Sequence, residues 1–246
     1  MGLVDLHSQT PTPVEPELSI EELIARPSFA AAVDLIEARY DFRRHSYFLW
    51  MDSPRTSIES FRASQVPFRF AVEAFSQALA AVVARTPRVE QRLGVLDNVD
   101  EEHGRGNLWA SHKATFTQFL RALGAGAPEL ERGCPVQVRA FNQALLDFSL
   151  TQPHEAGAAL LGIIEQLYIG ISASIALTVR VRGWCAPGSQ THYEVHEALD
   201  VSHARDLFAL AEPAWRESGS RAQVALGLGL GAHWFWALYR DLLPAG

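Results

Sequence analysis

The apolar residues of this 246-residue chain recur mostly three and four positions apart, the spacing of one face of an α-helix. Segment 56–84 keeps this spacing throughout, and Pro67 marks a point where its helix bends or breaks. No segment alternates apolar and polar residues over the length of a strand, and no hairpin turn joins two such segments. The pattern predicts an all-α protein.

Capping and breaking residues divide the chain into individual helices. Ser19 followed by Glu22 is a capping box, which opens a helix over about 20–40. Segment 43–56, which contains Pro54, is predicted to turn the chain. Further helices are expected over 87–102, 108–123, 135–150, 153–183, 189–211 and 219–242. The sequence therefore predicts a single-domain bundle of seven or eight helices.

Composition indicates where the folded domain begins and excludes some classes of protein and of ligand. Residues 1–18 are proline-rich and are expected to be a flexible lead-in, with one helical domain over 19–246. Hydrophobic residues make up 48% of the chain and charged residues 20%, a globular balance that excludes a disordered or fibrous protein. The net charge is −7 and the only lysine is Lys113, so no basic tract exists for nucleic acid to bind.

The most apolar stretch, 158–179, contains a single charged residue, Glu165. It is long enough to span a bilayer, but it stands alone between amphipathic helices, and we expect a buried core helix and no membrane partner. The N-terminus lacks the basic and apolar regions of a signal peptide, and two cysteines make no disulfide framework. A cytoplasmic location is therefore expected.

The sharpest chemical pattern is His196-x3-Asp200-x2-His203. Each residue of a helix advances by about 100°, so these three side chains share one narrow face. Two imidazoles and a carboxylate on one face are a ligand set suited to Fe(II). A solvated polar face or a capping network would also account for the pattern.

Glu165 supplies a further candidate ligand. An ionised carboxylate inside an apolar helix is costly unless a cation, a set of donors or a proton accompanies it. No Lys or Arg lies within one helical turn of Glu165. A bound metal would satisfy the carboxylate, and a neutral, hydrogen-bonded glutamic acid is the alternative.

The last candidates surround Gly104 and Gly106, with Glu101 and Glu102 before the glycines and His112 after them. On a continuous helix Glu102 and His112 would point about 80° apart. The glycines disfavour helix, so this segment is expected to bend or fray and to form the weaker half of a metal site. Acidic residues beside Gly-x-Gly also occur at ordinary helix ends.

Together these residues are the ligand stock of a carboxylate-bridged dinuclear site in a helical core. Their motifs resemble those of the haem-oxygenase-like diiron oxidases and oxygenases, within the haem-oxygenase/thiaminase-II superfamily, over about 40–240. The resemblance implies an all-α haem-oxygenase-like bundle. It also implies six iron ligands, which map onto Glu102, His112, Glu165, His196, Asp200 and His203. Glu101 is the rival of Glu102 for the first position.

The resemblance implies an activity as well. Members of this family bind two Fe(II) per chain, activate O2, and oxidise small biosynthetic substrates such as amino acids, amines or carboxylic acids. The reactions include N-oxygenation, oxidative C–C cleavage and desaturation. One branch consumes its own Tyr and Lys, but Lys113 lies beside a predicted ligand and not in the helix after Glu165, which argues against that branch. An external electron donor and a homodimer are compatible with this function.

Four residues are expected at the substrate pocket. Tyr168 and Ser172 follow Glu165 by three and seven residues and share its helical face. Arg180, near the end of the same helix, could receive a substrate carboxylate. His192 lies near the face of the predicted ligands, either as a hydrogen-bond partner of one of them or exposed at the helix start.

Other functions fit the sequence less well. Haem oxygenase needs a proximal His on the first helix, whereas His7 lies in the lead-in and His45 in a predicted turn. A thiaminase-like nucleophile would have to be Cys134 or Cys185, both next to Pro, Gly or Ala in loops. The glycine-rich segment 227–231 follows no strand, so we expect close helix packing there and no dinucleotide loop. A non-catalytic, metal-independent binding or regulatory protein of the same fold is the remaining alternative.

Overall fold

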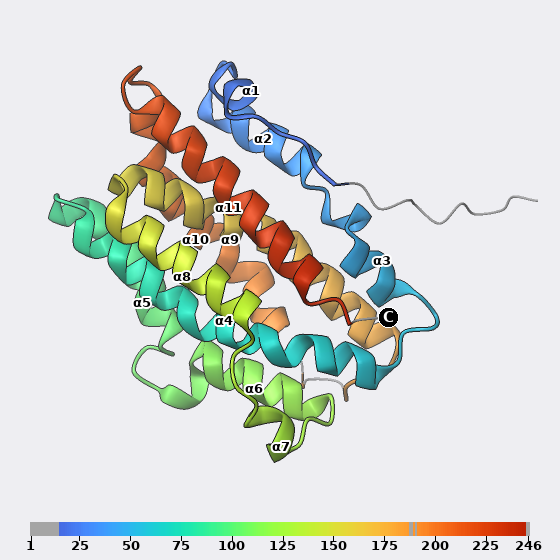
Figure 1. Ribbon diagram of the computed structural model, residues 1–246. Helices are drawn as coiled ribbons and strands as arrows, with labels where there is room; N and C mark the ends of the chain where they lie inside the picture. The colour runs from blue at the N-terminus through green and yellow to red at the C-terminus, as the bar shows by residue number, and fades with distance from the viewer. Residues whose placement is uncertain (1–14, 187–188, 190, 245–246) are drawn as a thin grey trace, which may run out of the picture.

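The computed structural model describes residues 15–186, 189 and 191–244, but not the side chains of 191 and 194–200. Over these residues the protein is helical and contains no strand, as the hydrophobic pattern predicts. The long helices pack around α9, which lies between α10 and α11, while α4 runs along α8 (Figure 1). This is the all-α bundle that the sequence indicates.

The first half of the chain contains α1 (Ile20–Ile24), α2 (Phe29–Arg39), α3 (Ser46–Asp52), α4 (Ile58–Arg85), α5 (Val89–Glu102), α6 (His112–Ala122) and α7 (Ala127–Leu130). The second half contains α8 (Val136–Thr151), α9 (His154–Val181), α10 (Thr191–Trp215) and α11 (Arg221–Asp241). Two 3-10 turns, Phe42–Arg44 and Leu108–Ala110, precede α3 and α6. Eight of these helices are eleven residues long or longer, in line with the predicted seven or eight.

The N-terminal region differs from the prediction in two places. The helix expected over 20–40 is two helices, because Pro27 disfavours helical backbone before it and the Ser28 side chain caps a new start. The turn expected over 43–56 contains α3, which begins at an unusual cap. There the Nδ1 atom of His45 accepts the backbone N–H of Tyr47 at 2.9 Å. A histidine cap is not a signal that sequence patterns reveal.

Helix α4 continues through Pro67 without a break. A proline inside a helix costs about 3 kcal/mol, because it removes one hydrogen bond and crowds the preceding turn. Burial of Phe61, Val66, Phe68 and Leu79 on the inner face of α4 offsets that cost.

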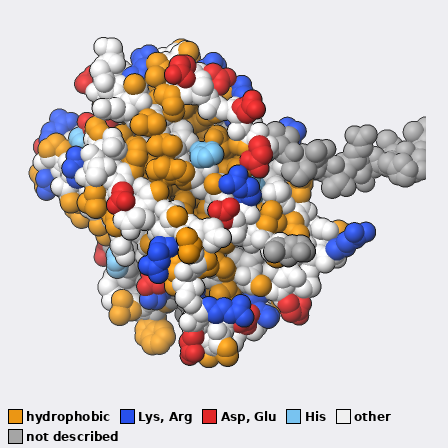
Figure 2. Space-filling model, in the orientation of Figure 1, with side chains coloured by type: hydrophobic (Ala, Val, Ile, Leu, Met, Phe, Trp, Pro, Cys, Tyr) orange, Lys and Arg blue, Asp and Glu red, His pale blue; other side chains and the backbone are white. Residues whose placement is uncertain are grey.

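Helix α9 is the core of the molecule, since 17 of its 28 residues are buried. By length and composition alone, α4 and α9 could each cross a membrane, but two-thirds of the most apolar window of α9 is buried inside the protein. The face in Figure 2 shows a broad hydrophobic area over α8 and α11, with charged side chains towards its edge. Helix α9 therefore serves as a packing element of this domain.

The glycine-rich segment lies inside α11, where it allows close contact with α9. A Cβ atom on Gly227 would lie 2.2 Å from the carbonyl oxygen of Ala156, and one on Gly231 would lie 2.4 Å from that of Leu160. The expectation of helix packing at 227–231 is thus confirmed. This contact also fixes α9, and with it Glu165, relative to the rest of the bundle.

The connection from α5 to α6 has the irregular backbone that the two glycines predict. Helix α5 ends at Glu102, and Gly104, Arg105 and Gly106 follow with φ angles of 67°, 52° and 82°. A Cβ on Gly104 would lie 2.2 Å from the carbonyl oxygen of Asn107, so this left-handed turn requires glycine there. The chain reverses over this turn and enters α6 at His112.

Candidate metal centre

Four of the six predicted ligands have described side chains, and all four are buried. Exposed fractions are 8% for Glu102, 7% for His112, 4% for Glu165 and 3% for His203. They lie on α5, α6, α9 and α10, respectively. The side chains of His196 and Asp200 lie outside the described residues, so the predicted three-ligand face of α10 is represented here by His203.

Glu102 and His112 form the first pair. An oxygen of Glu102 lies 2.8 Å from Nδ1 of His112, although the two would diverge on a continuous helix. The left-handed turn after Glu102 brings the start of α6 back against the end of α5, which closes the gap. The structural break that the glycines cause is therefore what brings this pair together.

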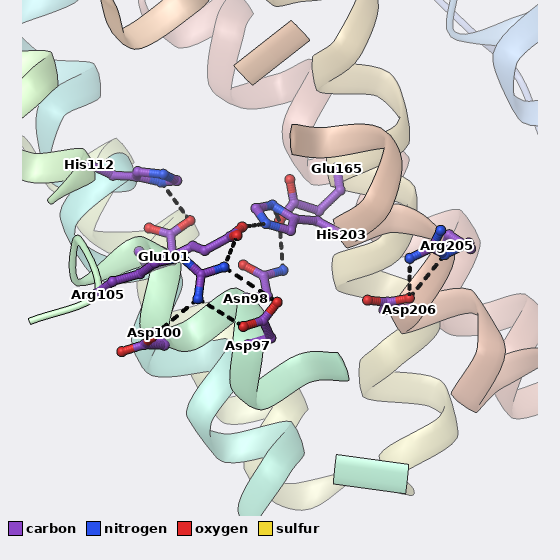
Figure 3. Close-up of polar contacts among 11 residues, drawn as sticks. Asp97, Asn98, Asp100, Glu101, Arg105, His112, Glu165, His203, Arg205 and Asp206 are labelled. Atoms are coloured by element: carbon purple, nitrogen blue, oxygen red, sulfur yellow. Dashed lines mark hydrogen bonds and ion pairs between the residues drawn. The ribbon is translucent and has the colours of Figure 1, made fainter. Parts of the chain in front are cut away.

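Glu165 and His203 form the second pair, on the adjoining helices α9 and α10. Oε1 of Glu165 lies 3.8 Å from Nδ1 of His203 and accepts a hydrogen bond from the Asn98 side-chain amide at 3.4 Å. Asn98 is 2% exposed and lies on α5 one turn before Glu102 (Figure 3). Sequence reasoning did not single out Asn98, because an amide at this position is also common on a solvated helix face.

The two adjacent glutamates at the end of α5 have different partners. Glu101 places Oε2 2.5 Å from Nε2 of His203 and also contacts Arg105, whereas Glu102 contacts His112. Successive residues on a helix point about 100° apart, so one acidic pair reaches both imidazoles. Figure 3 shows Glu101 between Arg105 and His203.

These side chains fit a metal ion, although the described part of the chain holds them in pairs and shows no cluster of three or more candidate ligands. The deciding atom is Nδ1 of His203, which is buried, faces Glu165 and has no hydrogen-bond partner among the described residues. Nitrogen and oxygen ligands about 2.1 Å from one metal lie about 3–4 Å apart, which includes the 3.8 Å observed. Imidazole and carboxylate donors without thiolate suit iron.

A pocket opens beside Glu102, His112 and Glu165. Glu102, His112, Glu165 and His192 form its polar end. Aromatic and aliphatic side chains from α4, α8, α9 and α11 form its walls: Phe68, Ala71, Val72, Phe75, Phe141, Ile164, Tyr168 and Phe235. Most of these wall residues were not predicted as site residues, because an aromatic residue at helical spacing looks the same whether it fills a core or lines a pocket.

The predicted pocket residues have different outcomes. Tyr168 lines the pocket, and its hydroxyl lies 3.4 Å from Nε2 of His192. His192 is 2% exposed and its Nδ1 lies 3.1 Å from Oγ1 of Thr115, so it is buried at the pocket and not exposed at the helix start. Ser172 is buried but lies outside the pocket lining.

Arg180 is not a pocket residue. It is exposed near the end of α9, about 22 Å along the helix from Glu165. The carboxylate-binding role expected for Arg180 is therefore wrong for this pocket. Sequence spacing placed it on the right helix but could not show how far the pocket extends.

A buried polar network anchors the start of α10 near His192. The Tyr193 hydroxyl donates to the side-chain oxygen of Gln65 at 2.7 Å, and the Gln65 amide donates to the Tyr47 hydroxyl at 2.6 Å. Burial raises the pKa of both tyrosines above its ordinary value, which keeps them neutral. The network ties α10 to α4 and α3.

The residues that would support a haem or thiol enzyme are placed elsewhere. His45 uses both ring nitrogens, since Nδ1 caps α3 and Nε2 donates to the Trp236 carbonyl at 3.0 Å. Burial lowers the pKa of His45 to about 4, so it is a neutral structural residue. Cys134 and Cys185 lie outside this pocket, and burial raises the pKa of both thiols, which disfavours a nucleophilic thiolate. His7 lies outside the described residues.

Solved structures share this fold. The chain resembles a TenA homologue from Pseudomonas syringae pv. tomato, with a TM-score of 0.69 and 14% identity over 95% of this chain and all of the other. It also resembles a domain with a haem oxygenase-like fold from Shewanella denitrificans, with a TM-score of 0.70 and 12% identity over 85% of this chain and 89% of the other. The all-α fold is therefore haem-oxygenase-like.

A sequence model of the family described as iron-containing redox enzymes matches residues 66–235. The chain belongs to this family. The matched region of this iron-containing redox enzyme includes both carboxylate–imidazole pairs and the two predicted ligands on α10 whose side chains lie outside the described residues, His196 and Asp200. The family thus agrees with the metal that the donor chemistry favours.

Two curated relatives are similar to this iron-containing redox enzyme over most of its length. The 4-aminobenzoate synthase of Chlamydia muridarum is 26% identical over 201 residues, which cover 80% of this chain and 84% of the relative. The 4-aminobenzoate synthase of Chlamydia trachomatis is also 26% identical over 201 residues, which cover 80% of this chain and 85% of that relative. Both relatives are named as enzymes.

Proposed function

We propose that this iron-containing redox enzyme is a non-haem diiron enzyme that uses O2 to oxidise a small biosynthetic substrate. The observation that carries the proposal is the placement of two carboxylate–imidazole pairs, from four helices, beside a mostly apolar pocket that Glu102, His112 and Glu165 line. Glu102 and His112 would contribute to holding one iron ion, His196, Asp200 and His203 to holding the other, and Glu165 would supply a further carboxylate to the centre. Bound iron would supply the electrons and the open positions at which O2 reacts.

The protein's own residues bind and shield the substrate. Phe68, Phe75, Phe141 and Phe235 exclude water from the reacting end of the pocket, which strengthens polar interactions there. Tyr168 and His192, whose polar atoms lie 3.4 Å apart, supply hydrogen-bonding groups at the same end. The other ring nitrogen of His192, Nδ1, lies within hydrogen-bond distance of Oγ1 of Thr115, and this contact orients the ring before the substrate binds.

The pocket also restricts the substrate. No Lys or Arg is among the described residues that line it, so an amino acid, amine or carboxylic acid would bind through its apolar part and direct its polar group towards the iron. The two relatives are named for an aromatic product, which agrees in kind with a pocket that contains five aromatic rings. An external electron donor belongs to the proposal, because a two-electron oxidation of the substrate supplies only two of the four electrons that reduce O2 to water.

The enzyme does not fit the branch that consumes its own lysine. Lys113, the only lysine of the chain, has a side chain that is 63% exposed and an Nζ atom 2.5 Å from a Glu73 oxygen. It follows His112 directly but is not part of the pocket lining. The substrate is therefore proposed to be a separate small molecule.

The test combines iron, O2 and a substrate screen. Protein loaded with Fe(II) under anaerobic conditions is exposed to O2 in mixtures of amino acids, amines and carboxylic acids, and products are identified by mass spectrometry. We expect iron-dependent consumption of O2 and of one substrate class, and loss of both in Glu102→Gln. A protein that takes up no iron, or that consumes no O2 with iron bound, would be the non-catalytic binding protein of the same fold.

A further inference from the structure

His203 lies between two carboxylates, which approach different nitrogens of its ring. Nε2 lies 2.5 Å from Oε2 of Glu101, while Nδ1 faces Oε1 of Glu165 at 3.8 Å. We propose that Glu101 is a positioning residue that keeps the proton of His203 on Nε2, so that Nδ1 is the nitrogen that binds iron. This inference rests on the proposed diiron function and assigns Glu101 a role distinct from that of Glu102.

The contact distance selects the position of the proton. A carboxylate only accepts hydrogen bonds, so an imidazole nitrogen 2.5 Å from it must carry a proton to donate. With the proton on Nδ1 instead, two lone pairs would face each other at this distance, inside a site where only 4% of the imidazole side chain is exposed. The proton on Nε2 leaves the lone pair of Nδ1 directed at Glu165.

The free nitrogen points where a metal ligand should point. Nδ1 of His203 is buried and has no hydrogen-bond partner among the described residues, although its ring is otherwise tightly held. A histidine that binds a metal commonly donates its second ring N–H to a carboxylate, which fixes the ring and makes the binding nitrogen more basic. Glu101 and His203 reproduce that arrangement.

Arg105 holds Glu101 in place from the other side. Its left-handed backbone, with φ of 52°, turns the side chain back across the last turn of α5, where it contacts Glu101 (Figure 3). The same guanidinium lies 3.1 Å from Asp97 and 3.5 Å from Asp100. Arg105 can therefore stabilise the charge of Glu101 without drawing it away from His203.

Glu101 and Glu102 differ in their surroundings as well as in their hydrogen-bond partners. Glu102 lines the pocket beside His112, where a substrate or iron is accessible. Glu101 is not part of that lining, and both of its oxygens have partners, Arg105 and His203. The two neighbouring carboxylates should thus respond differently to the same substitution.

The first experiment compares Fe(II) binding by anaerobic titration. Glu101→Ala should still bind the same number of ions but with about 10- to 100-fold lower affinity at one site. Glu101→Gln, whose side-chain oxygen still accepts the Nε2 proton, should lose less affinity, and Glu102→Gln should bind fewer ions. Asp100→Asn, a change to another carboxylate near Arg105, is the control and should bind as the wild type does.

Two results would overturn the assignment. Unchanged affinity in Glu101→Ala would show that the contact does not position His203 for metal. A lower number of bound ions in Glu101→Gln would make Glu101 a ligand and not a positioning residue. Circular dichroism of each variant shows whether the helical fold is kept.

The second experiment reads the binding nitrogen in the wild-type protein, so it does not depend on a variant that folds. The protein is labelled with ¹⁵N-histidine and loaded with Zn²⁺, a diamagnetic substitute, and long-range ¹H–¹⁵N spectra are recorded, with His203→Asn to identify the signals. We expect metal on Nδ1 and a proton on Nε2. Metal on Nε2 would refute this inference alone, whereas failure of the wild type to bind any metal would refute the proposed function.

Discussion

The side chain of Glu165 combines a charge with nearly complete burial. It is a carboxylate in the middle of the most apolar helix, and it is 4% exposed with an amide and an imidazole beside it. Burying a charge is tolerated where the partners or a metal offset the lost hydration. The residue therefore links the packing of α9 to the chemistry of the site.

Replacing Glu165 with Gln should separate those two roles. The variant keeps the shape and an oxygen for Asn98 but removes the charge, so it should lose iron and reduce O2 consumption by at least about 100-fold. In protein stripped of iron, its Tm should equal or exceed that of the wild type, because a neutral amide costs less to bury. Thermal melts and iron analysis provide the measurements. A large fall in Tm with iron binding intact would instead assign Glu165 a structural role.

His45 gives the protein a predictable response to acid. Burial lowers its pKa to about 4 from the ordinary value of 6.5, so between these pH values the unfolded chain binds the proton more readily. The contribution of His45 to the free energy of unfolding should thus be fully present above pH 6.5. It should fall as the pH drops towards 4, by up to about 3 kcal/mol. In His45→Asn, which keeps a cap for α3 but does not titrate, the loss over this range should be smaller by that amount. Denaturant melts at several pH values test this, and parallel curves would contradict it.

At this scale the sequence predicted some of the buried polar residues, such as Glu165, but it did not reveal Asn98 or show how these side chains pair. Glu101 and Glu102 could not be told apart, because each is acidic and adjacent to the same glycines. The contacts that separate them come from α10 and α6, which lie far along the chain. Asn98 and Arg105 carried no chemical signal until the helices were packed.

Among the elements, the α5–α6 connection controls one half of the site. Gly104 and Gly106 both have positive φ, but a Cβ on Gly104 would overlap backbone atoms, whereas one on Gly106 would meet no atom of the described residues within 4 Å. Gly106→Ala should therefore cost only backbone strain, about 1–2 kcal/mol. Gly104→Ala should cost more and also move His112 away from Glu102. Denaturant melts and Fe(II) titrations of the two variants test this prediction. Equal effects of Gly104→Ala and Gly106→Ala would contradict it.

The packing of α11 on α9 offers a second matched pair. A Cβ on Gly227 would overlap the Ala156 carbonyl, so Gly227→Ala should destabilise the protein by about 1–3 kcal/mol despite the better helix propensity of Ala. A Cβ on Gly229 would lie 3.0 Å from the flexible end of Ile20, so Gly229→Ala should be close to neutral. Thermal melts of the two variants measure the difference. A Gly227→Ala protein as stable as the wild type would show that the helices can separate at little cost.

The helices themselves were largely predictable, because spacing of apolar residues and caps such as Ser19 act locally. Three positions depart from the predicted helix boundaries, two for local reasons and one because of tertiary packing. Pro27 splits a segment whose apolar spacing runs on, and the imidazole cap at His45 starts a helix in a segment that contains a proline. At Pro67 tertiary packing overrides the breaker.

The whole molecule assembles the site from segments far apart in sequence. The carboxylate–imidazole pairs join residues 102 with 112 and 165 with 203, and the pocket walls come from α4, α8, α9 and α11. The burial of a polar residue at position 165 drew attention in the sequence because a single charged side chain stands out in the apolar helix α9. The pocket walls were not predictable, because their aromatic residues match any hydrophobic core and only the fold shows which of them border a pocket.

The two halves of the centre should bind iron unequally. The predicted ligands His196, Asp200 and His203 all lie on α10. Glu102 and His112, in contrast, are brought together by a connection with three consecutive left-handed residues, Gly104 to Gly106. Ordering that connection consumes part of the metal-binding free energy. The weaker site is therefore expected at Glu102 and His112.

Anaerobic titration of the protein with ⁵⁷Fe(II), followed by Mössbauer spectroscopy at each step, distinguishes a diiron centre from a single iron site and from no site. We expect two Fe(II) per chain, with one site filled before the other, and no more than one ion in Glu102→Gln. Binding of no iron, of a single ion, or of two ions unaffected by Glu102→Gln and by His196→Ala would contradict this expectation.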